Sequence, residues 1–259
     1  MRFSFVGMAA ALALSFVAAS AAKADFIVTF ENAGVLNTTT SFNYSGVETF
    51  DSRTNGGFTT DFGTGSSPIH ISGTYNSNTL IKDADIVGGA GGIGKYAATF
   101  NSTGYTLDLS AVDSTNGNTP VPITYFGFWL SALDAGNNVI FYRGGNPVFS
   151  FTPTDVISQV GNCPNVSNPF CGNPSGTFQG HKLDEPFVFL NFYDNSGLGF
   201  DKIVYLESIT GAGYESDNHT VGYFLNQTGN PSPAPEPETV SLFGIGLAAL
   251  GFVRRRKLA

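Results

Sequence analysis

The stretch ITYFGFWLSAL at residues 123–133 decides the fold, and the polar segment DAGNN at 134–138 separates it from VIFY at 139–142. Short apolar runs that are rich in aromatic and β-branched residues, with Gly, Asn and Asp between them, are typical of β-strands. Within residues 123–133 the apolar side chains fall on both faces of the expected strand. We therefore expect this strand to lie at the centre of a sheet.

The segments around this strand predict hairpins. Residues 134–138 have the composition of a hairpin loop, and residues 143–147 (RGGNP) have that of the next turn. Three consecutive hairpin strands are therefore expected between Ile123 and Phe151. Other short apolar runs predict further strands at residues 26–30, 69–71, 105–107, 187–193, 203–206 and 221–225.

This series of strands predicts an all-β fold, and the body at residues 25–230 is expected to be a β-sandwich of two sheets with jelly-roll connectivity. The first predicted strand, 26–30, and the last, 221–225, are expected to pair. A parallel β-helix is the alternative architecture, although the sequence has no fixed short repeat that supports it.

Composition limits the kinds of partner. The chain has 259 residues, with 12 Lys and Arg against 20 Asp and Glu, and a formal net charge of −8. No nucleic acid is expected as a partner, because affinity for phosphates comes largely from clustered cations. The 32 Gly residues and the 12% share of charged residues indicate a loop-rich β protein with an uncharged polar surface.

Residues 1–24 have the organisation of a secretory signal peptide. Arg2 precedes an apolar run, and small residues follow that end in Ala22-Lys23-Ala24. The A-x-A pattern formed by Ala22 and Ala24 predicts cleavage before Asp25, with the body outside the cytoplasm. An uncleaved anchor helix is the alternative.

The other end combines a linker, an apolar run and a cationic tail. Residues 231–238 (PSPAPEPE) are expected to be a stiff spacer, because proline lacks a backbone donor. Residues 239–253 carry no charge and would be about 22 Å long as a helix, against about 30 Å for a bilayer core. Residues 239–259 are predicted to be a short transmembrane helix whose basic tail stays in the cytoplasm.

This end of the chain resembles the PEP-CTERM sorting signal of bacterial exopolysaccharide producers. The resemblance rests on Pro235, Glu236, Pro237, Arg254, Arg255 and Arg256, with the apolar helix between them. It implies export by the secretion machinery, an anchor in the membrane, and processing by an exosortase, a membrane-embedded enzyme that releases the body to the cell surface or the extracellular matrix. A permanent single-span anchor is the alternative.

Parts of the body also resemble other exosortase-sorted surface proteins, which generally have no assigned enzyme activity. The segments concerned are residues 88–97, 126–137, 199–201 and 214–218. The last two are similar to the closing strands of lectin-like sandwiches. This resemblance implies a binding or matrix role.

Two cysteines are expected to form a disulfide. Cys163 and Cys171 enclose seven residues that are rich in turn formers. In an oxidising compartment such a pair closes the loop and stabilises the fold by about 2–3 kcal/mol.

Evidence for a metal site is limited to one pair of carboxylates. The three His residues are scattered, and residues 83–94 lack the Glu that ends an EF-hand loop. If the first and last strands pair, Glu31 and Asp217 converge, and their oxygens suit calcium. A calcium site at Glu31 and Asp217 is therefore one interpretation. The alternative is that both carboxylates are solvated at the ends of strands.

Sugar contact is predicted from aromatic residues. Trp129, Tyr142 and Tyr193 are the candidates for glycan stacking, although most aromatic residues must fill the core. Glycoside hydrolysis requires two carboxylates in one cleft, and the spacing of the acidic residues does not show which of them converge. No catalytic residue is assigned.

These observations predict an exported surface protein that is not an enzyme and that acts by adhesion or by contact with extracellular polysaccharide. A secreted polysaccharide-active enzyme is one alternative, and it would need paired carboxylates in a concave cleft. A self-associating structural matrix protein is the other, and it would expose an apolar patch or a free strand edge.

Overall fold

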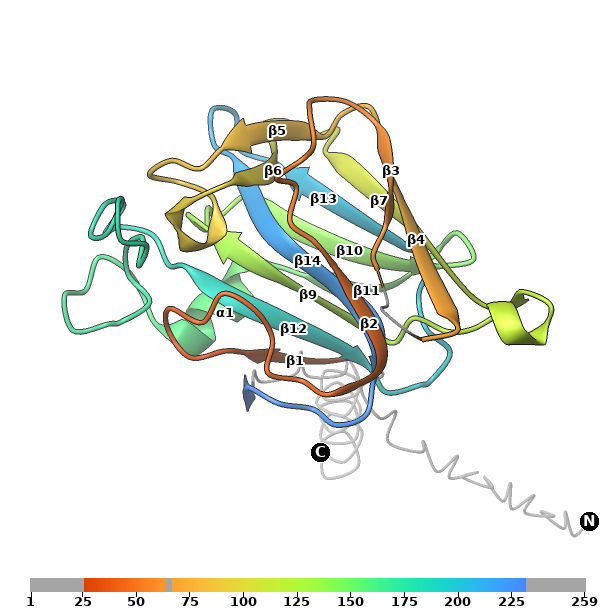
Figure 1. Ribbon diagram of the computed structural model, residues 1–259. Coiled ribbons are helices and arrows are strands. Elements are labelled where there is room, and N and C mark those ends of the chain that lie inside the picture. Colours follow the sequence, from red (N-terminus) through yellow and green to blue (C-terminus); the bar gives the residue numbers. More distant parts are fainter. Residues whose placement is uncertain (1–25, 64–66, 232–259) are drawn as a thin grey trace, which may run out of the picture.

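The computed structural model describes residues 26–63 and 67–231, which form two facing antiparallel β-sheets and one α-helix, α1 (Pro153–Val160) (Figure 1). The prediction of an all-β sandwich is confirmed. The predicted signal peptide, the linker from residue 232 and the predicted helix at 239–259 lie outside the described residues. Within them, no helix has the length and apolarity to cross a membrane.

Each sheet is built from strands that are distant in sequence. Sheet A has the order β15 (Asn230–Pro231), β1 (Phe26–Phe30), β12 (Val188–Asp194), β9 (Tyr125–Ser131), β14 (Tyr214–Phe224), β6 (Lys95–Thr99) and β5 (Leu80–Asp83), and β2 (Phe42–Glu48) also pairs with β14. Sheet B has the order β11 (Asn146–Phe151), β10 (Asn137–Arg143), β13 (Lys202–Glu207), β7 (Tyr105–Asp113), β4 (Ile69–Tyr75) and β3 (Phe58–Asp61), and β8 (Thr119–Pro120) also pairs with β7.

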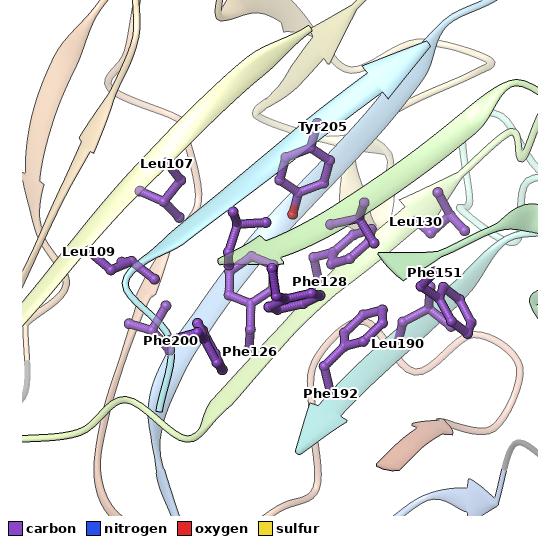
Figure 2. Packing of buried hydrophobic residues seen from close by; sticks show 14 of the residues in the cluster. Leu107, Leu109, Phe126, Phe128, Leu130, Phe151, Leu190, Phe192, Phe200 and Tyr205 are labelled. Carbon is purple, nitrogen blue, oxygen red and sulfur yellow. The ribbon is translucent and has the colours of Figure 1, made fainter. Parts of the chain in front are cut away.

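The strand at the centre of the sequence argument is central in the fold. β9 pairs with β12 on one side and β14 on the other, and all its residues are buried. Phe126, Phe128 and Leu130 point between the sheets, where the two Phe rings meet Tyr205 of sheet B (Figure 2). The prediction of a strand buried on both faces is confirmed.

The predicted series of three hairpin strands is partly wrong. β10 and β11 form the expected hairpin, but β9 and β10 lie in different sheets. Both edges of β9 are occupied by β12 and β14, so the chain crosses to sheet B after Ser131. Asn137 fixes this crossing, because its Nδ2 donates to Glu207 Oε2 (2.6 Å) and to the carbonyl oxygen of Gly213 (2.8 Å).

The predicted pairing of the first and last strands is also wrong. Residues 221–225 belong largely to β14, whose edges are taken by β9, β6 and β2. β1 pairs instead with β12 and with the short β15, where Thr29 lies opposite Pro231. The chain thus returns to β1 only after β14 has ended.

The outer sides of the two sheets differ in exposure. On sheet B, buried and exposed residues alternate along β4 and β7, so one side of the sheet faces solvent. We call that side the open face, and it carries Thr59, Asp61, His70, Ser72, Thr74, Asp108, Ser110, Tyr142 and Lys202. On sheet A, loops cover the outer side, which we call the covered face, and it carries the buried residues Trp129, Phe187, Phe189, Glu215 and Asp217.

Candidate functional site

Two of the three candidate stacking residues are enclosed. Trp129 and Tyr193 are 1% and 0% exposed, so neither ring can stack on an external sugar, and this prediction is wrong for both. Trp129 packs with Phe187 and Phe189 under the covering loops. Tyr142 is half-buried and lies on the open face beside Lys202, so stacking by Tyr142 stays a prediction.

The expected convergence of Glu31 and Asp217 does not occur, because β12 and β9 lie between β1 and β14. Glu31 Oε1 accepts hydrogen bonds from Thr39 N (3.0 Å) and Asn191 Nδ2 (3.1 Å). Asp217 Oδ2 accepts one from Ala90 N (2.8 Å). Each carboxylate therefore has protein partners of its own. The two residues do not form the calcium site that the sequence left open.

Burial changes the acidity of two carboxyl groups on the covered face. It raises the pKa of Glu215 to about 8, and the negative charges of Asp134 and Glu185 raise it further. It also raises the pKa of Asp217 to about 7, although two backbone N–H donors oppose the rise. Within the described residues, no group of three or more His, Cys, Asp and Glu side chains is placed to hold a metal ion.

A serine and a histidine meet between the sheets. His219 Nε2 lies 3.0 Å from Ser216 Oγ, and its Nδ1 lies 2.9 Å from Tyr75 OH. The ring is 0% exposed, and burial lowers its pKa to about 3. No substrate can reach an enclosed pair of this kind. The network therefore satisfies buried polar atoms rather than forming a nucleophilic site.

The Gly-rich segment 88–94 is part of the cover over sheet A. Gly88, Gly89 and Ala90 in this segment are buried. A Cβ at Gly88 would lie 2.4 Å from the ring of Tyr96, so only glycine permits this close approach. The segment is therefore packed against the covered face.

The predicted disulfide is confirmed, because Cys163 and Cys171 are bonded. It closes a loop that leads into the covered face. Phe187 N donates to the carbonyl oxygen of Phe170, and Cys171 forms a β-bridge with Pro186. The disulfide is thus a support for the segment that covers sheet A.

An open groove of about 260 Å³ lies where β7 extends beyond the start of β13. We call it the β7–β8 groove, and it is lined by Ala111, Val121, Pro122, Arg143, Leu198 and Asp201, among others. The lining is mainly apolar, and Leu198 is 68% exposed. Such concave apolar sites with a few polar groups are the usual form of a small-ligand site.

Arg143 and Asp201 are the charged groups of this groove. Arg143 Nε donates to the carbonyl oxygen of Gly199 (2.5 Å), and its Nη2 donates to Asp194 Oδ2 (2.7 Å) and Ser196 Oγ (3.1 Å). Asp201 Oδ2 accepts from the N–H that follows Arg143 (2.7 Å). Within the described residues, Arg143 Nη1 and Asp201 Oδ1 have no hydrogen-bond partner.

Sequence reasoning did not assign a role to Arg143 or Asp201. Residues 199–201 stood out through their resemblance to lectin-like sandwiches, and residues 143–147 were interpreted as a turn. The two segments are linked by hydrogen bonds between residues far apart in the chain, from Arg143 Nε to the carbonyl oxygen of Gly199 and from Gly144 N to Asp201 Oδ2. Such a contact cannot be inferred from spacing.

Comparison with known proteins gives a match at one end of the chain. No curated protein and no solved structure matches the chain. Residues 233–257, which include Pro235, Glu236, Pro237 and Arg254 to Arg256, match the family model of the PEP-CTERM protein-sorting motif. This motif implies export, a membrane-anchored precursor and processing by an exosortase. The chain therefore carries a PEP-CTERM sorting signal that directs it to the cell surface.

Proposed function

We propose that the sandwich is a non-catalytic, lectin-like module that acts at the cell surface or in the extracellular matrix, by adhesion through contact with extracellular polysaccharide. The observation that carries this proposal is the open face. Its exposed side chains are mostly uncharged hydroxyl groups, as expected for a surface that exchanges hydrogen bonds with sugar hydroxyls.

The hydroxyl groups of the open face form cross-strand pairs. Ser72 Oγ lies 3.0 Å from Ser110 Oγ, and Thr59 Oγ1 lies 3.4 Å from Thr74 Oγ1. These exposed pairs hold each other weakly, because water competes for them. They can therefore exchange partners with a ligand hydroxyl at little cost. Tyr142 adds an aromatic ring to the same face.

The enzyme alternative lacks support in the groove. Glycoside hydrolysis requires two carboxylates on either side of the scissile bond. Among the described residues that line the β7–β8 groove, Asp201 is the single carboxylate. The structure thus favours binding over hydrolysis at this position.

The self-association alternative requires a contiguous apolar surface. In the described part of the chain, the large apolar side chains that are exposed lie in loops or on β2, for example Ile93, Val166 and Val47. None of them lies on the open face. That face therefore suits a polar ligand better than a second copy of the chain.

A sedimentation experiment tests the proposal. The protein is recovered from the surface of its native host and centrifuged with and without the extracellular polysaccharide of that host. We expect it to sediment with the polysaccharide, to remain in solution alone, and to release no new reducing ends. Protein that stays in the supernatant with polysaccharide contradicts the proposal. New reducing ends would support the enzyme, and sedimentation of protein alone would support self-association.

We also infer that the mature protein begins at Asp25 and has lost the predicted helix at residues 239–259. The A-x-A pattern and the position of the sorting motif support this inference. Intact-mass measurement of the surface protein tests it. The mass of the unprocessed chain, 27.3 kDa, would contradict both processing steps.

A further inference from the structure

The β7–β8 groove places one donor and one acceptor beside an apolar lining. Val121, Pro122 and Leu198 supply apolar surface, and Arg143 and Asp201 supply the polar groups. A sugar ring presents the matching chemistry, with C–H groups on one side and hydroxyl groups at its edge. Hydroxyl groups both donate and accept, so one pair of neighbouring hydroxyls can satisfy Arg143 Nη1 and Asp201 Oδ1.

We propose that the β7–β8 groove is a binding subsite for one neutral sugar unit of a polysaccharide. This inference rests on the proposed function and assigns the contact to named residues. The C–H side of the ring packs on Pro122 and Leu198. One hydroxyl accepts a hydrogen bond from Arg143 Nη1, and a neighbouring hydroxyl donates to Asp201 Oδ1.

The charges around the groove favour a neutral unit over an acidic one. The positive charge of Arg143 is already matched by Asp194, whose side chain is 0% exposed and lies 2.7 Å away. Asp201 adds a negative charge at the edge of the groove, and no cation pairs with it within the described residues. The carboxylate of a uronic acid would be repelled there, whereas a hydroxyl donates to Asp201 without this cost.

The polar groups are held in place before a ligand arrives. Three protein acceptors fix the guanidinium of Arg143, and the backbone N–H of Gly144 fixes Asp201. Because Gly144 follows Arg143 directly, the turn that orients one group also orients the other. A preorganised pair loses little side-chain entropy on binding, and this favours affinity from few contacts.

Two groove variants and one matched control test the subsite. Asp201→Asn removes the charged acceptor, and Leu198→Ser removes an exposed part of the apolar lining. Asp51→Asn is the control, because Asp51 is also exposed and also accepts from a backbone N–H, that of Lys95 (3.0 Å). Asp51 follows β2 of sheet A, away from the open face and outside the groove. Arg143 is left unchanged because it holds the neighbouring loop.

The probes are the neutral and acidic fractions of the host's extracellular polysaccharide, separated by anion exchange and titrated by calorimetry into the full exported protein. We expect the neutral fraction to bind wild type and Asp51→Asn equally. Asp201→Asn is expected to bind about tenfold more weakly or worse, because it removes a hydrogen bond to a charged acceptor. Leu198→Ser is expected to bind about tenfold more weakly, because it removes apolar contact with the sugar ring. Melting temperatures of all variants report whether the fold is kept.

Each other result overturns a defined part of the inference. If the neutral fraction binds both groove variants as it binds wild type, glycan contact stands and the groove is not its site. If the acidic fraction alone binds, the neutral class is wrong. If neither fraction binds wild type, the proposed function fails, and the subsite fails with it. Should Asp201→Asn lower the melting temperature, Leu198→Ser decides.

Discussion

The covered face and the open face belong to the same sandwich but have opposite environments. On sheet A, loops close over Trp129, and the carboxyl groups of Glu215 and Asp217 are removed from water. On sheet B, Ser72 and Ser110 hydrogen-bond to each other in full contact with solvent. On the outer sides of the two sheets, the cover rather than the strands therefore decides which carboxyl groups have shifted pKa values and which polar groups are free to meet a ligand.

This difference separates stability from recognition. Side chains on the covered face contribute by burial, so changing them alters the free energy of unfolding. Side chains on the open face have water as an alternative partner, so changing them alters binding while the fold is kept.

The largest expected effect is the loss of Trp129. Its side chain fills the cluster between sheet A and the covering loops, so Trp129→Ala leaves a cavity there. We expect the free energy of unfolding to fall by about 3–5 kcal/mol, as measured by denaturant titration. Thr74→Ala on the open face is the control, and it should change stability by no more than about 0.5 kcal/mol. Equal losses of stability for Trp129→Ala and Thr74→Ala would show that the two faces are buried to the same extent.

The second effect is a pH dependence that originates on the covered face. The pKa of Glu215 is raised from 4.5 to about 8 in the folded state, so between these pH values this carboxyl group binds more protons in the folded protein than in the unfolded chain. The stability that Glu215 contributes is therefore fully present below about pH 4.5 and is lost as the pH rises through about 8.

Glu215→Gln removes the titrating group. We expect the variant to be more stable than wild type at pH 8, by on the order of 3 kcal/mol, and to lose less stability between pH 5 and pH 8. Asp108→Asn, at an exposed carboxylate of the open face, is the matched control and should not reproduce the gain in stability at pH 8. A wild-type stability that rises between pH 5 and pH 8 would contradict the burial of Glu215.

The third effect concerns the cover itself. Replacing both Cys163 and Cys171 by Ser opens the loop that precedes Phe187 on the covered face. We expect a loss of about 2–3 kcal/mol in the free energy of unfolding, from the entropy of a short closed loop. Hydrogen exchange should increase in residues 161–187 and stay unchanged in β4 and β7. Increased exchange across sheet B instead would mean that the disulfide supports the whole sandwich.

The sequence predicted the strands whose burial follows from apolar residues alone. β9 was identified because both of its sides are apolar, and it is buried on both. β2, β5 and β6 were missed because their stability comes from pairing and cover rather than from apolar runs. In β6, for example, Ala97 and Ala98 are small, yet both are fully buried. Glu215 and Asp217 are polar and interrupt the apolar pattern of β14, so the first half of this strand was not predicted either.

Helix α1 was not predicted, although its first residues carry a capping signal. Thr152 caps the helix, Pro153 occupies its first turn, and Asp155 completes a capping box. The apolar residues that follow, Val156, Ile157 and Val160, span too short a segment to predict a helix by themselves. Local capping chemistry would have identified it where periodicity did not.

The candidate site was less predictable than the fold, because exposure depends on distant parts of the chain. Trp129, Tyr142 and Tyr193 looked equivalent as aromatic residues of strands. Trp129 is buried under loops that include Ala90, and Tyr193 donates to the carbonyl oxygen of Thr228 (3.2 Å) near the end of the described chain. Of the three, Tyr142 alone lies on a side that no described segment of the chain covers. Alternation of apolar and polar residues along a strand shows that the two sides of a sheet differ in polarity. It does not show which side a distant loop will cover.

The smallest expected effect is on the open face. The double change Ser72→Ala with Ser110→Ala removes an exposed hydroxyl pair, and water can replace both partners. We expect stability to change by no more than about 0.5 kcal/mol.

The matched buried pair is Tyr105 OH and Ser216 Oγ, which lie 2.6 Å apart between the sheets. Ser216→Ala leaves the hydroxyl of Tyr105 without this partner in the interior, so a loss of about 1–3 kcal/mol is expected. Denaturant titration of both variants compares one kind of hydroxyl contact in two environments. If the open-face change cost as much as the buried one, water would not reach Ser72 and Ser110. The open face would then be closed by a partner in solution, and a contact surface for polysaccharide would have to lie elsewhere.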